Sequence, residues 1–252
     1  MQVQTEGIVL RATKYSEADL IVNIFTKKFG KIGAYAKYAR RMKSPLMSAT
    51  QIFSLSNMTL SSFDGRYKLV QADLIDNNFS ISSSYAKTYL GYYFLQFVEK
   101  ISLEEHTNLR LFELLKSALA SLKRDENILL QKIIFDLKII DIFGYKPVMS
   151  QCTICGKHEQ LGNNFNISEG GRICSDCMPS VAQTPAYNFR LDSTSFRLAD
   201  YILKNDYETI LQAKISDIIL MELNTVLDKY IDYHFDNLDL HTRRMLVFKE
   251  EL

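Results

Sequence analysis

The chain of 252 residues lacks any long apolar segment, because no stretch of about 18 uncharged apolar residues occurs in it. A membrane-spanning helix is therefore not expected. The first residues, MQVQTEGIVL, also lack the basic segment, apolar run and small-residue cleavage site of a signal peptide. We therefore predict a cytoplasmic protein that does not associate with membranes.

The chain also lacks the short motifs of common catalytic sites. Gly30-Lys31 and Gly156-Lys157 have no upstream glycine at the spacing of a phosphate-binding loop, and neither Gly-x-Ser-x-Gly nor His-Glu-x-x-His occurs. The four histidines, at positions 106, 158, 234 and 241, are scattered. We therefore predict that the protein is not an enzyme, although a zinc-dependent enzyme acting on nucleic acid stays open as an alternative.

Acidic residues are absent between Asp19 and Asp64, a window of 44 residues. Residues 1–80 contain eleven Lys and Arg but six Asp and Glu, whereas residues 151–252 contain ten and fifteen. Such asymmetry indicates an anion-binding surface in the first part of the chain.

The cations of this window alternate with aromatic residues. In an extended strand Lys31, Tyr35 and Lys37 share one face, and the apolar residues between them share the other. By the same alternation Tyr38 is expected to point inward. DNA phosphates require cations and unpaired bases require rings to stack on, so the predicted nucleic-acid-binding residues are Lys27, Lys28, Lys31, Tyr35, Lys37, Arg40, Arg41 and Lys43. A merely solvated basic face is one alternative, and a surface for an acidic protein partner is another.

Two structural patterns divide the chain near a serine-rich segment at residues 80–84. Residues 1–80 read as five short strands, at 3–10, 20–26, 31–38, 52–60 and 67–74, with a hairpin signal at Asp64-Gly65. Five short strands fit a small closed or partly open barrel better than an open sheet, because closure removes exposed edges. Residues 81–252 show helical spacing, with helices expected near 90–101, 109–122, 127–143, 193–204 and 220–230. The predicted fold is therefore α+β and multidomain, with a β-barrel followed by an all-α domain.

All four cysteines lie in two Cys-x-x-Cys pairs, Cys152/Cys155 and Cys174/Cys177, with eighteen residues between the pairs. Two such turns supply the four thiolates of a tetrahedral Zn²⁺ site, so we predict one structural zinc ion in an inserted module at residues 148–181. Two disulfides or a redox-active thiol pair remain as alternatives. A closed four-thiolate shell leaves no position for a catalytic water.

Several segments together resemble the RecO family of recombination mediators. Residues 5–10 (TEGIVL), 15–19 (YSEAD) and the basic segment 36–44 (AKYARRMKS) are similar to the start of that family, where the position of Tyr38 is often glycine. Residues 143–147 (FGYKP), which lead into the cysteine pairs, resemble its zinc-bearing members. Residues 233–235 and 243–246 are similar to its closing helix.

This resemblance implies an N-terminal OB-fold and a nucleoid-associated DNA repair protein. It further implies binding to single- and double-stranded DNA, annealing of complementary strands, and help in loading the RecA recombinase onto DNA coated by single-strand-binding protein. RecR and the acidic C-terminal tail of single-strand-binding protein are the implied partners. For that tail the best basic patch in the sequence is Lys116, Lys123, Arg124 and Lys132, although an ordinary solvated face is the simpler reading of each.

Overall fold

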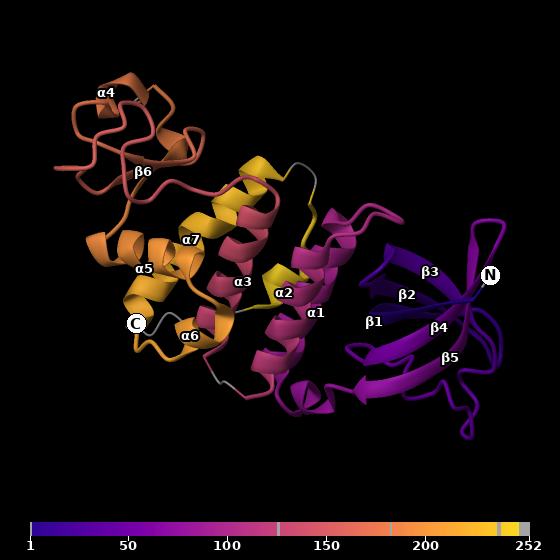
Figure 1. Cartoon of the computed structure of the whole chain (residues 1–252). Coiled ribbons are helices and arrows are strands. Elements are labelled where there is room, and N and C mark those ends of the chain that lie inside the picture. The colour runs from indigo at the N-terminus through magenta and orange to yellow at the C-terminus, as the bar shows by residue number, and fades with distance from the viewer. Residues whose placement is uncertain (1, 125–126, 182, 236–237, 247–252) are drawn as a thin grey trace. The chain divides into compact units, whose positions relative to one another are not determined.

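The chain folds into two compact units, Met1–Arg124 with Leu240–Leu252, and Asp125–Asp239. The computed structural model describes residues 2–124, 127–181, 183–235 and 238–246 (Figure 1). Within these ranges no helix has the length and apolar character that a membrane crossing requires.

The first unit contains a closed five-stranded barrel. Its strands are β1 (Gln2–Lys14), β2 (Leu20–Thr26), β3 (Gly30–Ala36), β4 (Leu55–Phe63) and β5 (Arg66–Asp76). They follow the order β1-β2-β3-β5-β4, and β1 closes the barrel by pairing with β4. All neighbours are antiparallel except β3 and β5. This is the topology of the OB-fold, and it confirms the predicted fold class.

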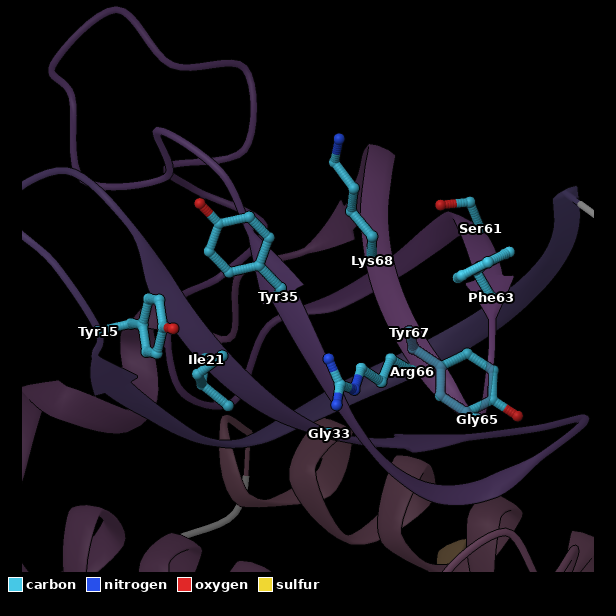
Figure 2. A pocket seen from close by; sticks show the side chains of 10 residues that line it. All are labelled: Tyr15, Ile21, Gly33, Tyr35, Ser61, Phe63, Gly65, Arg66, Tyr67 and Lys68. Carbon is cyan, nitrogen blue, oxygen red and sulfur yellow. The ribbon is translucent and has the colours of Figure 1, made fainter.

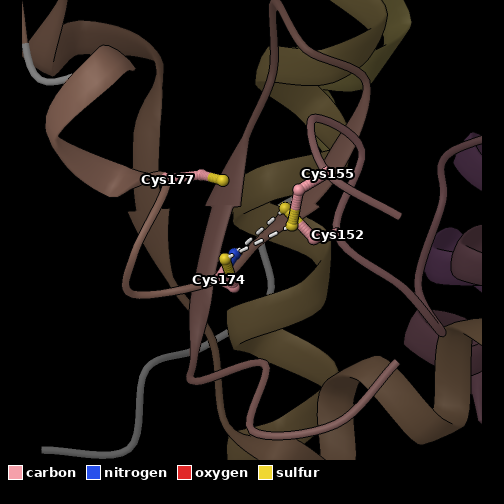
Figure 3. A group of neighbouring side chains, drawn as sticks. All are labelled: Cys152, Cys155, Cys174 and Cys177. Atoms are coloured by element: carbon pink, nitrogen blue, oxygen red, sulfur yellow. Dashed lines mark hydrogen bonds between the residues drawn. The ribbon is translucent and has the colours of Figure 1, made fainter. Parts of the chain in front are cut away.

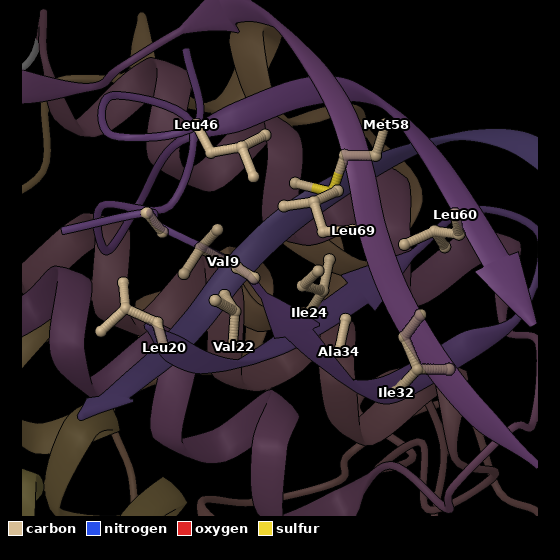
Figure 4. Close-up of a cluster of buried hydrophobic side chains, with 12 residues drawn as sticks. Val9, Leu20, Val22, Ile24, Ile32, Ala34, Leu46, Met58, Leu60 and Leu69 are labelled. Atoms are coloured by element: carbon tan, nitrogen blue, oxygen red, sulfur yellow. The ribbon is translucent and has the colours of Figure 1, made fainter. Parts of the chain in front are cut away.

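Alternating apolar residues fill the barrel (Figure 4). Val22 and Ile24 of β2, Ile32 and Ala34 of β3 and Met58 of β4 are all at most 1% exposed and belong to one cluster. The predicted alternation on β3 is confirmed, since Ile32, Ala34 and Ala36 are buried there. Phe25 points the other way and packs against Phe112, with ring centroids 6.1 Å apart, so this ring serves the contact with a helix rather than the barrel interior.

Two long helices belong to the same unit as the barrel, namely α1 (Tyr85–Ile101) and α2 (Leu109–Leu122). The Asn108 side chain accepts the Leu111 N–H at 3.0 Å and so begins α2. The segment between the helices contacts the barrel where His106 meets Gly30, a glycine with a φ of +64°. A Cβ at that position would lie 2.0 Å from the His106 carbonyl oxygen, so only glycine fits. Two short 3₁₀ segments, η1 (Phe79–Ser83) and η3 (His241–Met245), pack against α1.

The second unit is built around α3 (Ile128–Ile142), which contacts α5 (Ser193–Lys204), α6 (Tyr207–Leu211) and α7 (Asp217–His234). A small sheet of β6 (Asn164–Asn166), β7 (Gly171–Ile173) and β8 (Asn188–Arg190) follows α3, together with α4 (Met178–Val181) and η2 (Pro185–Tyr187). Strands β6 and β7 pair antiparallel and form a hairpin whose turn contains Gly170.

One prediction about side-chain direction is wrong. Strand β3 ends at Ala36, so the alternation that placed Tyr38 inward no longer applies there. Tyr38 has a φ of 59° and is 41% exposed. This left-handed backbone conformation explains why glycine suits the position in the family that the sequence resembles.

A buried ion cluster holds α3 and α7 together. The Lys132 ammonium donates to Asp136 at 2.8 Å, to Asn224 at 2.7 Å and to Asp228 at 2.7 Å, and the side chains of Lys132 and Asp136 are 1% and 0% exposed. Burial would lower the pKa of Lys132, but the two carboxylates raise it above its ordinary value, so the ammonium stays charged. Lys132 is therefore an interior residue and cannot belong to the predicted surface patch.

Removing one partner of this cluster should strongly destabilise the second unit. We expect Asp136→Ala to lower the free energy of unfolding by about 3–5 kcal/mol, because it leaves the buried Lys132 charge with less compensation. Asp200→Ala removes an exposed i,i+4 pair with Lys204 and should cost less than about 1 kcal/mol. Urea unfolding followed by circular dichroism measures both, and equal effects of the two variants would contradict this reading of the cluster.

Candidate nucleic-acid interface and metal centre

A groove of about 680 Å³ opens on the barrel where β3 meets β5 (Figure 2). These strands pair at only two positions, Ala34 with Tyr67 and Tyr35 with Lys68, so the barrel wall is least continuous there. The residues that line the groove are Tyr15, Ile21, Gly33, Tyr35, Ser61, Phe63, Gly65, Arg66, Tyr67 and Lys68. Four of them are aromatic, two are cations and none is acidic.

The rings and cations in this groove suit a single nucleic-acid strand. Phe63, at the end of β4, is 85% exposed, and the rings of Tyr15 and Tyr35 meet edge to face at 5.7 Å. Exposed rings offer stacking platforms for unpaired bases, and cations beside them attract the phosphates. Burial, together with the nearby Glu105 carboxylate, raises the pKa of the Tyr67 hydroxyl.

Asp19 organises one end of this groove. Its carboxylate accepts the Tyr35 hydroxyl and the Tyr38 backbone N–H, both at 2.7 Å, and the Ser16 hydroxyl at 2.9 Å. The hydrogen bonds from Tyr38 and then Tyr35 hold the pKa of Asp19 below its usual value. Asp19 therefore stays ionised and fixes both the Tyr35 ring and the start of the following loop.

The eight residues predicted to bind nucleic acid do not form one surface. Carboxylates of the helical part of this unit neutralise two of them: Lys27 pairs with Glu113 at 2.9 Å, and Lys31 pairs with Glu104 at 3.2 Å. Lys28 is exposed, and its backbone carbonyl accepts the Thr107 hydroxyl at 2.7 Å. Lys27 and Lys31 thus attach helices to the barrel, whereas Tyr35 lines the groove.

The other four predicted cations lie in or next to the loop that follows β3. The Lys37 ammonium and the Arg41 guanidinium lie over the Tyr38 ring, at 4.7 and 3.8 Å from its centroid. Arg40 donates to the carbonyl oxygens of Ser16 and Glu17 at 3.0 and 2.6 Å. Lys37, Arg40, Arg41 and Lys43 are all exposed, and none forms a salt bridge with a carboxylate among the described residues, although Lys37 interacts electrostatically with Asp19. They form a basic loop that continues the groove-lining strand.

Sequence reasoning missed five groove residues, Tyr15, Phe63, Arg66, Tyr67 and Lys68. The signal was present in the chain, because Arg66-Tyr67-Lys68 alternates cation and ring as the 31–37 segment does. The acid-free window stops at Asp64, in the β4–β5 turn, and so excluded the second basic strand.

The patch suggested for an acidic tail is not formed. Lys116 pairs with Glu6 at 2.8 Å, Lys123 pairs with Asp76, and Lys132 is buried. These lysines share helical spacing in the sequence, but each faces an internal partner, so the suggestion is wrong.

The four cysteine sulfurs converge in the second unit and lie within 4.8 Å of one another (Figure 3). The Gly156 N–H donates to the Cys152 carbonyl at 2.9 Å, and the Cys177 N–H donates to the Cys174 carbonyl at 3.2 Å, so each pair sits on a tight turn. The sulfurs of Cys155 and Cys174 are 3.8 Å apart. That distance matches the edge of about 3.8 Å in a tetrahedron with metal–sulfur bonds of about 2.3 Å.

The electrostatics of this cluster favour a cation. Burial would raise the pKa of the Cys152 thiol, but backbone N–H groups of Cys155, Cys174 and Ile154 lower it to about 6. Hydrogen bonding to Cys174 and Cys155 raises the pKa of Cys177 to about 12. The backbone N–H groups around Cys152 thus favour its thiolate, the form that binds a metal. The donor set therefore fits a soft metal ion.

The fold and these sites define a class: a protein that joins an OB-fold barrel with an aromatic, cationic groove to a helical unit with a four-cysteine cluster. A family model described as recombination protein O N terminal matches residues 1–78, and one described as recombination protein O C terminal matches residues 82–244.

Curated relatives agree with these matches over nearly the full length. The chain is 36% identical to the DNA repair protein RecO of Alkaliphilus metalliredigens (strain QYMF) over 246 residues, which are 96% of this chain and 97% of the relative. It is 31% identical to that of Thermoanaerobacter sp. (strain X514) over 93% of each chain. The chain belongs to the RecO family of DNA repair proteins.

Substitution of a buried cysteine should release the metal. We expect the purified wild-type chain to contain about one ion per chain, and Cys152→Ser or Cys174→Ser to contain almost none, because a three-thiolate site binds far more weakly. Elemental analysis measures the metal content. His158→Ala is the matched control, since His158 is exposed and outside the cluster. Full retention of metal in both cysteine variants would contradict the assignment.

Proposed function

We propose that this chain is a DNA-binding mediator of recombinational repair. It binds single-stranded DNA in the barrel groove, anneals complementary strands, and assists loading of the RecA recombinase onto DNA coated by single-strand-binding protein. The observation that carries this proposal is the groove itself, which combines four rings with Arg66 and Lys68 and has no acidic lining. Family membership supports the role in repair, and the resemblance adds RecR as a partner and the nucleoid as the place of action.

The basic loop extends the proposed contact with DNA. Lys37, Arg40, Arg41 and Lys43 follow directly on the strand that carries Tyr35, so a strand that stacks on Tyr35 meets their positive charges next. Backbone phosphates supply the attraction and carry no base sequence, so the proposed binding is sequence-independent. Such binding suits a protein that must act on any broken DNA.

We further propose that the metal is one structural zinc ion. Its role follows from the completed shell, because four thiolates leave no open position for substrate. When bound, the ion neutralises the thiolates and holds the two cysteine turns together. A structural zinc site typically contributes roughly 10–16 kcal/mol, which exceeds what so small a segment can gain from its own core.

The groove makes a quantitative prediction for salt dependence. Each phosphate contact with single-stranded DNA adds about 0.7 to the slope of log affinity against log salt. The double variant Arg66→Gln/Lys68→Gln should therefore reduce that slope by about 1.4 and should slow annealing of complementary strands by the protein alone.

Lys27→Gln is the matched control for this variant. It removes a barrel cation that Glu113 already neutralises, so the slope should change by less than about 0.3. Fluorescence anisotropy with a labelled single strand measures all three proteins. An unchanged slope in the double variant, or no annealing by wild type at any salt, would favour an adaptor that binds an acidic protein.

We propose that the acidic tail of single-strand-binding protein binds in a groove of about 430 Å³ in the second unit. Arg197 and Lys214 flank its apolar lining, which includes Leu198, Tyr201 and Ile219. Cations beside an apolar floor complement a peptide that carries both carboxylates and apolar side chains.

Charge reversal tests this assignment. Arg197→Glu/Lys214→Glu should weaken binding of a labelled tail peptide by about tenfold or more, because attraction becomes repulsion. Lys116→Gln changes a lysine of the originally suggested patch and should leave the affinity unaltered. Titration of the full chain with the peptide measures both. Loss of binding in the control alone would place the tail on α2 instead.

A further inference from the structure

The basic loop has an apolar apex. Ala39 and Leu46 belong to the barrel core and are 1% and 6% exposed, so both ends of the intervening segment 40–45 are anchored. Within it the Ser44 N–H donates to the Arg41 carbonyl at 2.9 Å and closes a four-residue turn. Met42 lies at the corner of that turn and is 91% exposed, more than any other large hydrophobic side chain among the described residues.

The surroundings of Met42 do not resemble a protein-docking patch. Arg40, Arg41 and Lys43 are exposed on either side of it, and none of the three has a carboxylate partner in the described part of the chain. Protein interfaces gather several apolar side chains and deplete charge at their centre. A single apolar side chain between cations instead complements DNA, in which stacked bases form an apolar layer between two rows of phosphates.

The loop is also held in place before any ligand arrives. The Arg41 guanidinium stacks on the Tyr38 ring at 3.8 Å, and the Tyr38 N–H is fixed by Asp19. Arg40 is tied to the Ser16 and Glu17 carbonyls. Met42 therefore projects from a loop that is already ordered, so binding should cost little further conformational entropy there.

We propose that Met42 is a wedge that inserts between stacked base pairs of double-stranded DNA, while Arg41 and Lys43 contact the phosphates beside the opened step. Methionine is among the side chains that proteins insert in this way, and the phosphate contacts offset the free energy of unstacking. Flexible pyrimidine–purine steps are the preferred points of entry, because they unstack most easily. This inference rests on the proposed DNA binding and adds a second mode of contact to it.

The position of Met42 would place an opened base step next to the groove proposed for a single strand. Tyr35 lines the groove for unpaired bases and lies on β3, only three residues before Tyr38 at the base of the loop. A duplex opened at Met42 would thus adjoin the site that takes a single strand. Strand annealing requires paired and unpaired DNA to be held next to each other.

Base unstacking can be measured separately from binding. A short duplex with 2-aminopurine at a central TA step is titrated with the full-length protein, and both anisotropy and 2-aminopurine fluorescence are recorded. Wild type should increase the fluorescence severalfold at saturation. Met42→Ala should abolish that increase while the Kd changes by no more than about threefold, because the phosphate contacts remain. Met42→Leu should retain the increase.

Met47→Ala is the matched control, since Met47 is 40% exposed just beyond the same loop. It should leave both signals unchanged. Duplex binding by wild type without any fluorescence increase, or an increase that survives in Met42→Ala, would overturn the wedge and leave DNA binding intact. Absence of binding to any DNA would overturn the proposed function as well. Unstacking that is insensitive to Met42 would assign this side chain to a protein partner instead.

Discussion

The structure of the first unit depends on which cations of the barrel pair with carboxylates of the helical part and which stay unpaired. Glu99 pairs with Arg11, Glu104 with Lys31 and Glu113 with Lys27, and through these contacts the α1–α2 region is fixed to one side of the barrel. The cations on the groove and the basic loop receive no such partner among the described residues. Neutralisation of one side therefore concentrates the positive field of the barrel on the other.

This division gives each group of cations a single role. A cation that is paired and half-buried has a fixed position and little remaining field, so it serves the docking of helices. An exposed and unpaired cation keeps its field and can exchange small counterions for phosphates. Asp19 is an acidic residue that lies among the exposed cations of the groove and the basic loop. It accepts hydrogen bonds from Tyr35 and Tyr38 and so orders a ring and a backbone turn.

The second unit differs from the first because it contains an ion cluster in its interior. The Lys132 cluster joins α3 to α7, and the four thiols gather where the chain between them forms only short strands. The Lys132 cluster is buried, so it is stable only if each of its charges is compensated. Carboxylates and Asn224 do this for Lys132, and the four cysteines form a donor set that fits a soft cation.

Much of this could be predicted from local patterns. Residues 20–26 were expected to be a strand and are one, because apolar alternation and a turn at residues 28–30 determine it. The cysteine cluster followed from spacing alone. Three distant ion pairs could not be predicted, namely Lys27 with Glu113, Lys31 with Glu104 and Lys132 with Asp228. The partners lie 73 or more residues apart along the chain, and only tertiary folding brings them together. The direction of Tyr38 does not follow from strand alternation, because β3 ends at Ala36 and Tyr38 has a left-handed backbone conformation.

The central claim is that DNA contacts the unpaired side of the barrel and not the side neutralised by the helices. Photo-crosslinking with a single strand that contains 5-bromodeoxyuridine, followed by peptide mapping, tests it directly. The expected crosslinks fall on Tyr15, Tyr35, Phe63 and Tyr67. Crosslinks confined to peptides around Lys27 and α2 would contradict the claim.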